Sequence, residues 1–591
     1  MKTTKKILFK YIGVLLFAVV MSTSCVDYLE KAPEVSISEE DIFTKFNSFQ
    51  GYIENIYQNI PDLQLSVDAT NGWNYGDDVH PSNTDQMCAY WERGATNAWN
   101  YKHSPYAGRV GGTYVVDNTN KRKGYWHNGW LGIRQANIGL KNLDKFVGTQ
   151  EERDILEGQC LFFRGQFHWE ILRAWGGVPY IDTVFAATDK LIAPRLSYLE
   201  TANRISVDLK RAAELLPASW DESGPGQATL GSNAGRITKG AAYGYLGMNL
   251  LYAASPLANG VETGNYEYNT ELCKQAAEAF YEVIKLANMG YHGLETWENY
   301  RDIFYSLTGK MPNANKEVIF SNPVYMYKKY NRGEGFVYAV AAGAGSAVTA
   351  NYVDYFGMAN GLPIDAEGSG YNPADPWVNR DPRFYYNITK DGDRIIQNTN
   401  NADTYAQFYV GGRHSTYKAI NISFVYKKFY HITCNNYDVG WNSWYSETPH
   451  LRLAEIYLNY AEAVNEAYGP NGSIPGGITA VKAVNIIRNR AGVPDVDTRY
   501  LNDKAAFREI VRQERAVELA FEGHRWNDLR RWHIAHLMKY REKYHLEFDK
   551  NHTYFKKVLD VTTVHEEKHY WLPFEVDLVN MYEGFKQNPG W

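Results

Sequence analysis

The sequence predicts a mainly α-helical protein, built from degenerate tetratricopeptide-type helical repeats that carry large irregular loop inserts. Apolar residues recur at helical spacing over a series of segments of similar length. Helices of this length, joined as antiparallel pairs, form such repeats, although the consensus of about 34 residues per repeat is not visible. Two long stretches, 62–125 and 289–445, show no sustained period and are rich in Gly, Asn and Tyr.

The N-terminus has the composition of a signal peptide. Lysines precede an apolar run at 12–21, which is too short for a comfortable membrane span. The small residues at 22–24 lead to Cys25, and this arrangement resembles the lipobox of bacterial lipoproteins. We expect a signal peptide over 1–24, acylation of Cys25 and a lipidated tether over 25–37. The alternative is an ordinary secretory signal with an incidental cysteine.

The first helix is expected at 38–60. Asp41 follows Ser38 by three residues, which is a capping-box arrangement weakened by Asp in place of Glu, and Pro61 ends the apolar face. Further helices are predicted at 126–147, 151–175, 198–216, 237–254, 271–288, 451–468, 480–491 and 503–532, the last being the longest. Within the second insert, 317–320 and 423–430 are β-like.

Composition narrows the class of protein. Hydrophobic residues make up 45% and charged residues 22%, values typical of a globular chain and not of a disordered one. The net charge is −6 and no Lys/Arg-rich run follows the first ten residues, so no nucleic-acid partner is expected. The chain has 46 Tyr and 16 Trp, side chains that suit a surface gripping polar, ring-shaped or extended ligands. A large Tyr-rich core would give the same composition.

Cysteine usage indicates neither a disulfide scaffold nor a zinc knuckle. Four cysteines remain beyond Cys25, far apart and without C-x-x-C spacing: Cys88, Cys160, Cys273 and Cys434. Cys160 lies in an apolar helical pattern and is expected to be a buried thiol.

A row of carboxylates is predicted on the longest helix. Glu514, Glu518 and Glu522 repeat every four residues and share one face. Glycoside hydrolysis needs two carboxyls flanking a sugar in different environments. Carboxylates stacked on one helix beside Arg515 and Arg525 are instead expected to be ion-paired and ionised. The core-facing side is expected to hold Phe507, Ile510, Val511, Val517, Phe521 and Trp526, with Trp532 also packed.

Residues 565–569 (HEEKH) match the H-E-x-x-H pattern of zinc proteases. That chemistry needs two histidines one helical turn apart, with the Glu as general base. The preceding residues 561–564 (VTTV) favour a strand and Pro573 follows closely, so we expect no metal site here. Phosphate-binding loops and nucleophile elbows are absent, and no organic cofactor is expected.

Short motifs occur in a fixed order along nearly the whole chain. They are 25–33 (CVDYLEKAP), 173–180 (RAWGGVPY), 235–243 (GRITKGAAY), 379–384 (NRDPRF), 452–462 (RLAEIYLNYAE), 487–493 (IRNRAGV), 514–530 (ERAVELAFEGHRWNDLR) and 587–591 (QNPGW). Each motif is weak alone, but their order is specific, and together they resemble the SusD/RagB family of Bacteroidetes outer-membrane lipoproteins.

The resemblance implies a SusD-like protein, lipid-anchored in the outer membrane and facing outward. Such a protein would bind glycan, without catalysis, and deliver it to a SusC-like TonB-dependent transporter. It also implies an N-terminal region over 38–310 and a C-terminal SusD/RagB region over 311–591, which together form one compact unit.

A glycan site needs aromatic platforms for the C–H faces of sugars and polar groups for their edges. The resemblance implies that these come from the first insert and from the middle one. The expected residues are Trp73, Tyr75, Asp77, Asp78, Trp91, Arg93, Trp99, Asn100 and Tyr101 in the first, and Tyr327 in the second. One acidic pair, Asp77 and Asp78, is not a Ca²⁺ coordination set, so no cofactor is expected.

Three other functions remain open from the sequence. One is a peptide-binding, RagB-like member of the same architecture, since helical-repeat grooves often take peptides. The others are a glycoside hydrolase acting through the Glu row and a zinc protease acting through His565 and His569. In either enzyme the chain would release product from its ligand.

Overall fold

The computed structural model describes a defined part of the chain. This part comprises residues 39–60, 84–89, 125–186, 188–190, 192–306, 315–321, 328–329, 346–398, 400–417, 420–429, 431–433, 437–438, 444–446, 448–580 and 584–591. The predicted signal peptide, Cys25, the tether, Ser38 and Cys434 lie outside the described residues. No helix of the described ranges is long and apolar enough to cross a membrane.

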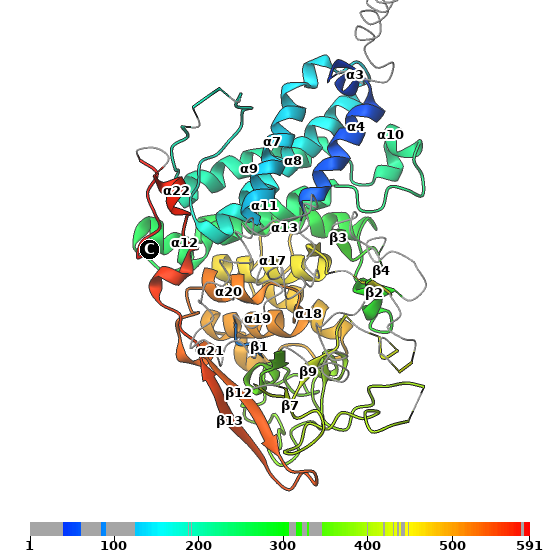
Figure 1. The fold of residues 1–591 in the computed structure, drawn as a ribbon, viewed down its shortest axis with the longest axis vertical. Helices are drawn as coiled ribbons and strands as arrows, with labels where there is room; N and C mark the ends of the chain where they lie inside the picture. Colours follow the sequence, from blue (N-terminus) through cyan, green and yellow to red (C-terminus); the bar gives the residue numbers. More distant parts are fainter. Residues whose placement is uncertain are drawn as a thin grey trace, which may run out of the picture.

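Long helices form the scaffold, and each packs on its neighbour in the chain. The order of contacts is α7 on α8, α8 on α9, α9 on α11, α11 on α13 and α13 on α17, with α18 and α19 both against α17. Figure 1 shows α7–α9 in the upper part and α17–α20 below them. The helices are α7 (Tyr125–Lys141), α8 (Gln150–Trp175), α9 (Tyr198–Leu215), α11 (Lys239–Ala254), α13 (Thr270–Asn288), α17 (Leu453–Tyr468), α18 (Ala480–Arg490) and α19 (Lys504–Glu518). This sequential stacking confirms the predicted mainly α, repeat-like class.

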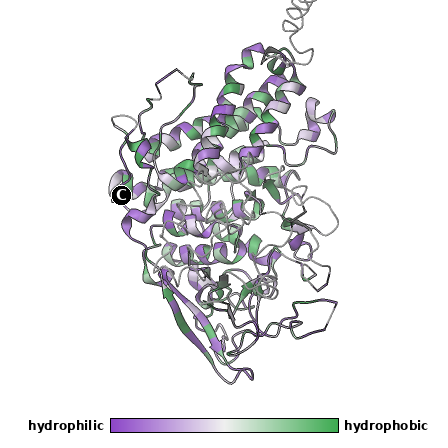
Figure 2. Cartoon of the chain, viewed as in Figure 1, coloured by the Kyte–Doolittle hydropathy of each residue, from purple (hydrophilic) through white to green (hydrophobic). Residues whose placement is uncertain are grey.

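Capping explains where two of these helices begin. Thr149 and Glu152 form a reciprocal capping box at the start of α8, and Ser197 and Glu200 do the same for α9. Helix α8 ends at Gly176, whose φ of 80° is open to glycine at little cost. Figure 2 shows hydrophobic and hydrophilic residues interspersed along the helices, as their packing on two neighbours and on solvent requires.

The first predicted helix is wrong as a single element. It is divided into α3 (Glu39–Thr44), α4 (Phe46–Glu54) and the 3₁₀ helix η1 (Asn55–Asn59), with Lys45 extended between the first two. The break frees the carbonyl of Thr44 to accept from the N–H of Val147, at 3.0 Å. Ser48 donates to carbonyls around the break, which helps to satisfy the groups left open there.

The longest predicted helix is also wrong as one element. Helix α19 ends at Glu518, and α20 (Arg525–Arg531) follows a turn in which Phe521 and Gly523 have positive φ. The carbonyl of Glu518 explains the break, because it accepts from Lys428 Nζ at 2.9 Å and Arg452 Nη2 at 2.9 Å. A continuing helix would give that carbonyl to the N–H of Glu522, which donates to Leu519 instead. Buried side chains thus replace the helical hydrogen bond.

Three clusters of buried apolar residues lie among the described elements. The first lies among the long helices and includes residues from Phe43 to Phe585; the second lies under the strands and includes residues from Met87 to Phe548. The third is small and contains Ala254, Tyr268, Cys273 and Trp532. The predicted core residues of the longest helix are buried, Trp526 and Trp532 included, and Cys160 is fully buried with its thiol pKa raised to about 12 by burial.

The strands are short and antiparallel. Of the two β-like runs, 317–320 contains β3 (Val318–Phe320), paired with β11 (Leu451–Arg452), and 423–430 contains only β9 (Val425–Tyr426), paired with β6 (Ile388–Thr389). The hairpin β12 (Glu542–Phe548) and β13 (Phe555–Thr562), at the lower end of Figure 1, was not predicted. The remaining described strands and α-helices outside the candidate site are β7 (Thr416–Tyr417), β8 (Ile420–Asn421), α10 (Gly224–Gln227), α12 (Pro256–Thr263), α15 (Ala350–Val353), α16 (Pro382–Asn387), α21 (Met538–Arg541) and α22 (Val576–Val579).

Candidate functional site

The candidate site is the region where strands from the two inserts, 62–125 and 289–445, pair with each other. The predicted ligand residues themselves lie outside the described part of the chain. These are Trp73, Tyr75, Asp77, Asp78, Trp91, Arg93, Trp99, Asn100, Tyr101 and Tyr327. The structure does describe the strands that hold both inserts, and these strands carry the following argument.

The two inserts are joined by a strand pair. Strand β1 (Met87–Ala89), from the first insert, pairs antiparallel with β5 (Ser346–Val348), from the second, with Met87 opposite Val348. The N–H of Thr349 continues the contact by donating to the carbonyl of Gln86 at 3.0 Å. Segments more than 250 residues apart therefore meet at one place on the scaffold.

A second, three-stranded sheet joins distant parts of the middle insert. Strand β10 (Trp444–Ser446) lies between β2 (Tyr305–Ser306) and β4 (Lys328–Lys329) and is antiparallel to both. Tyr327, a predicted ligand residue, directly precedes β4 in the sequence. The sheet therefore fixes the chain at the residue that follows this candidate.

A buried ion pair anchors the first insert to the scaffold. Asp85 is fully buried and accepts from Arg525 Nε at 2.9 Å and from Arg525 Nη2 at 2.7 Å, which is bidentate geometry. The hydroxyl of Tyr355 donates to the same carboxylate at 3.1 Å. Burial opposes the charge of Arg525, but Asp85 and Tyr355 hold its pKa well above the ordinary value. Arg525 therefore stays charged at neutral pH.

Further hydrogen bonds hold the same segment, and two of them bind its backbone carbonyls. Gln86 Nε2 donates to the Tyr352 hydroxyl at 2.6 Å, and Tyr352 donates in turn to the carbonyl of Ala516 at 2.5 Å. Thr349 Oγ1 donates to the carbonyl of Asp85 at 2.5 Å, and Lys543 Nζ donates to that of Met87 at 2.8 Å. The segment 85–87 is thus held to the rest of the structure at several points.

No sequence pattern indicated this anchor. Asp85 and Arg525 are 440 residues apart, and the local sequence around each one does not identify its partner.

The Glu row is ion-paired, as expected. Burial alone would raise the pKa of Glu518, but Arg490, Arg452 and Arg383 hold it well below its ordinary value. The predicted neighbours were wrong: Arg515 pairs with Asp528 and Arg525 with Asp85. The actual pairs are Glu514 with Arg383 and Arg488; Glu518 with Arg383, Arg452 and Arg490; and Glu522 with Arg452 and Lys428.

The H-E-x-x-H match does not have the geometry of a zinc-protease helix. His565 precedes the 3₁₀ helix η10 (Glu567–Tyr570), and His569 Nδ1 accepts from the N–H of Glu566 at 2.9 Å. Burial lowers the pKa of both imidazoles, that of His569 to about 4. Within the described ranges, no three His, Cys, Asp or Glu side chains are grouped closely enough to hold a metal ion.

Known proteins match most of the chain. The family model described as "Starch-binding associating with outer membrane" matches residues 27–249, and the model of the SusD family matches residues 316–591. Two SusD-like proteins of Formosa agariphila are each 24% identical to this chain. The first match covers 70% of this chain and 72% of the relative, and the second covers 69% of this chain and 70% of the relative.

Solved structures agree with these matches. A SusD-like protein from Bacteroides fragilis superposes with a TM-score of 0.69 at 25% identity, over 95% of this chain and 100% of the other. A SusD-like carbohydrate-binding protein from the same species has a TM-score of 0.64 at 21% identity, over 92% of this chain and 100% of the other. With its motifs in family order, its stacked helices and these matches over both halves, the chain belongs to the SusD/RagB family.

Proposed function

We propose that the protein captures an oligo- or polysaccharide at the cell surface and delivers it, uncut, to a SusC-like TonB-dependent transporter. The observation that carries the proposal is the β1–β5 pair, which brings the two aromatic-rich inserts onto one rigid support. Family membership supports the ligand class, since one matching model is described as starch-binding and one similar structure as a carbohydrate-binding protein.

The proposed site combines the two inserts. Trp73, Trp91 and Trp99 would stack on the C–H faces of sugar rings, and Tyr75, Tyr101 and Tyr327 would extend this surface. Sugar hydroxyls would bond to the polar groups between them, namely Asp77, Asp78, Arg93 and Asn100. Binding would need no metal ion, so that a chelator leaves the affinity unchanged.

Capture without cleavage is supported by how the carboxylates of the Glu row are used. Glu518 and Glu522 are fully buried and bonded to Arg and Lys. A glycosidase needs one carboxyl protonated and a second one free to attack or to activate water. Neither residue has the environment for either role.

The lipobox-like sequence and the family support the proposed location in the cell. An acylated Cys25 would hold the chain on the outer membrane through the tether at 25–37. The description "associating with outer membrane" of the matching family supports this location. The transporter would be a separate chain beside the anchor.

Substitution of the insert tryptophans tests the proposed site. We expect Trp73→Ala, Trp91→Ala and Trp99→Ala each to weaken binding of a retained glycan about 10-fold or more, because each loses a stacking platform. Isothermal titration calorimetry measures the change. Tyr554→Ala, an exposed aromatic at the β12–β13 turn, is the matched control and should bind like the wild type. Unchanged affinity in the triple tryptophan variant would contradict the proposal.

A further inference from the structure

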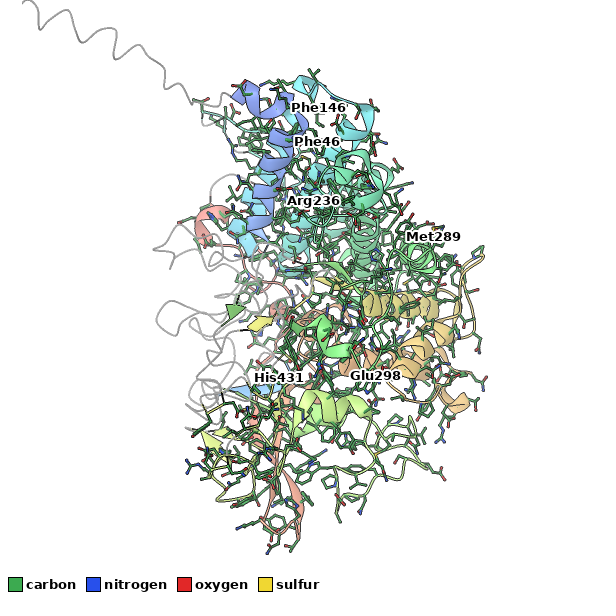
Figure 3. All side chains as sticks on the ribbon, turned by 90° about the vertical axis from the view of Figure 1, so that its right-hand side faces the viewer. Phe46, Phe146, Arg236, Met289, Glu298 and His431 are labelled. Carbon is green, nitrogen blue, oxygen red and sulfur yellow. The ribbon has the colours of Figure 1, made fainter. Side chains whose placement is uncertain are left out.

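The upper end of the molecule in Figure 1 carries exposed apolar side chains at the place where the described chain begins. This end is formed by α3, by the start of α4 and by the connection between α7 and α8, residues 142–149. Val147, in that connection, is 79% exposed, more than any other large apolar side chain of the described residues. Figure 3 shows Phe46 and Phe146 at the same end. We call the surface made by Phe46, Phe146 and Val147 the apolar tip.

Hydrogen bonds hold the backbone of the apolar tip in place. The N–H of Val147 donates to the carbonyl of Thr44 at 3.0 Å, at the break between α3 and α4. Arg153 Nη1 donates to the carbonyl of Leu143 at 2.5 Å, and its Nη2 pairs with Asp144 at 3.2 Å. The connection is therefore bonded at more than one point, and it presents the side chain of Val147 to the outside from a defined position.

Two aromatic rings extend this surface, and lysines lie beside them in the sequence. Phe46 and Phe146 are half-buried and pack against the first cluster of buried apolar residues. The exposed Lys45 directly precedes Phe46, and the exposed Lys145 directly precedes Phe146. Apolar side chains next to lysines are typical of surfaces that lie in a membrane interface. There the apolar groups enter the acyl boundary, and the long lysine side chains reach the headgroups.

The position of the apolar tip along the chain indicates which surface it meets. Scattered exposed apolar side chains are common on proteins, so exposure alone does not identify a partner. The tip, however, lies where the described chain begins at Glu39, next in sequence to the proposed lipid on Cys25. An extended chain advances at most about 3.6 Å per residue, so residues 26–38 keep this end within about 50 Å of that lipid. Asp41 and Asp144 offset nearby lysines, so we expect apolar contact to dominate over attraction between opposite charges.

We propose that the apolar tip lies in the surface of the lipid bilayer, with Val147 and the exposed parts of Phe46 and Phe146 among the headgroups. The proposal rests on the proposed function in one respect, because the lipid on Cys25 brings this end to the membrane. The tip would give the protein a second contact with the bilayer besides that lipid. Two contacts would hold the molecule in a defined orientation, with the β12–β13 hairpin at its opposite end (Figure 1).

Fluorescence at the apolar tip tests this contact. The chain from Val26 onward carries an N-terminal hexahistidine tag and is bound to vesicles of phosphatidylethanolamine, phosphatidylglycerol and a nickel-chelating lipid. The environment-sensitive fluorophore NBD is attached to Val147→Cys in a Cys434→Ser background, where the three remaining cysteines are buried. We expect attachment to the vesicles to shift the NBD emission to the blue, and nitroxide-labelled lipids to quench it. The tag replaces the acyl chain, so the result does not depend on acylation of Cys25.

Val207→Cys, labelled in the same way, is the matched control. Val207 is 68% exposed on α9, next to Asp208, which pairs with Arg164 in the middle of α8 and away from the apolar tip. Its NBD emission should not change on attachment. Equal responses at positions 147 and 207, or no response at 147, would overturn the proposal. Neither result concerns the acylation of Cys25, so failure of the tip and failure of the lipid anchor are distinguishable.

Val147→Asp tests the role of the apolar side chain itself. The NBD fluorophore is moved to Lys141→Cys, at the exposed end of α7, so that it reports on the same end of the molecule. Val147→Asp should weaken the membrane contact about 10-fold, because an apolar side chain no longer leaves water, and the NBD response should be lost. A response that persists would contradict the proposal. Self-association that this substitution abolishes, measured by sedimentation velocity, would assign the tip to a second copy of the chain and overturn the membrane contact.

Discussion

Arg452 shows how single charged residues determine this fold. Its guanidinium is buried and donates to Glu522 at 2.7 Å, to Glu317 at 2.7 Å and to Glu518 at 2.9 Å. The carboxylates of its partners come from the flank of β3 and from the end of α19. The guanidinium therefore joins three parts of the chain, and its loss leaves several buried charges unpaired.

We expect Arg452→Met to lower the free energy of unfolding by about 3–5 kcal/mol, because breaking a buried ion pair strands the remaining charge. Urea denaturation measures the loss. Arg211→Met is the control, since Arg211 is half-exposed and lies 3.2 Å from Glu214 on the surface. That change should have a far smaller effect. If both substitutions lowered the free energy of unfolding equally, the buried ion pairs of Arg452 would not have the stabilising role described here.

His168 is held neutral in the core. Its Nδ1–H donates to the carbonyl of Arg164 at 2.8 Å, and its Nε2 accepts from the N–H of Ile181 at 3.0 Å. Both nitrogens are thereby satisfied in the neutral form, and burial lowers the pKa to about 3. The unfolded chain has an imidazole with an ordinary pKa of about 6.5.

The sign of the pH effect follows from these two pKa values. Below about pH 6.5 the imidazole of His168 binds a proton in the unfolded chain but stays neutral in the folded protein. Protonation therefore favours the unfolded chain, and the free energy of unfolding falls as the pH falls. Between pH 7 and pH 5 this single group should lower the free energy of unfolding by about 2 kcal/mol. We expect His168→Gln to be less stable at pH 7 but to lose about 2 kcal/mol less over that interval, as measured by urea titrations at several pH values. If the free energy of unfolding of the variant fell with pH as steeply as that of the wild type, His168 would not be the group responsible for this pH dependence.

At the scale of elements, the turn between α19 and α20 is the main departure from helical periodicity. Gly523 lies in that turn with φ of 92° and is buried. We expect Gly523→Ala to destabilise the protein by about 1–2 kcal/mol, because a Cβ disfavours positive φ. Gly51→Ala, on the exposed face of α4 with open space around it, should instead stabilise by about 0.5–1 kcal/mol. Thermal unfolding of both variants measures these changes in stability. A Gly523→Ala variant more stable than the wild type would contradict the expected cost of a Cβ at positive φ.

Helices with complete local signals were predictable, and elements that depend on distant partners were not. Helix α8 has its capping box at Thr149 and its stop at Gly176 in the sequence itself. The break after Glu518 depends on Lys428 and Arg452, which periodicity does not reveal. Strand β12 was missed because two of its buried positions, Lys543 and His545, are polar and hide the alternation.

The candidate functional residues also divide into those that local sequence indicated and those that depend on distant partners. The composition of the first insert indicated aromatic ligand residues, and these stay predictions because they lie outside the described residues. The ion pair of Asp85 with Arg525 joins segments remote in sequence. Such sites appear only once the fold brings their parts together.

At the scale of the whole molecule, the proposed function includes a lipid tether at one end of the chain. We expect Cys25→Ala to abolish acylation and to release the protein from the membrane fraction, because the proposal makes this thiol the acceptor. Labelling cells with an alkyne fatty acid, followed by fractionation, measures both effects. Retained label and retained membrane association would show that the anchor lies elsewhere.

The central claim is that the protein captures glycan without cutting it. Electrophoresis of the chain from Val26 onward through native gels containing a panel of polysaccharides tests it most directly, with each mixture assayed for new reducing ends. If the protein captures glycan without cutting it, at least one polysaccharide retards it and no mixture gains reducing ends. Retardation by none, with binding to extended peptides instead, would favour a RagB-like peptide receptor. New reducing ends that appear with the pure protein would contradict capture without catalysis.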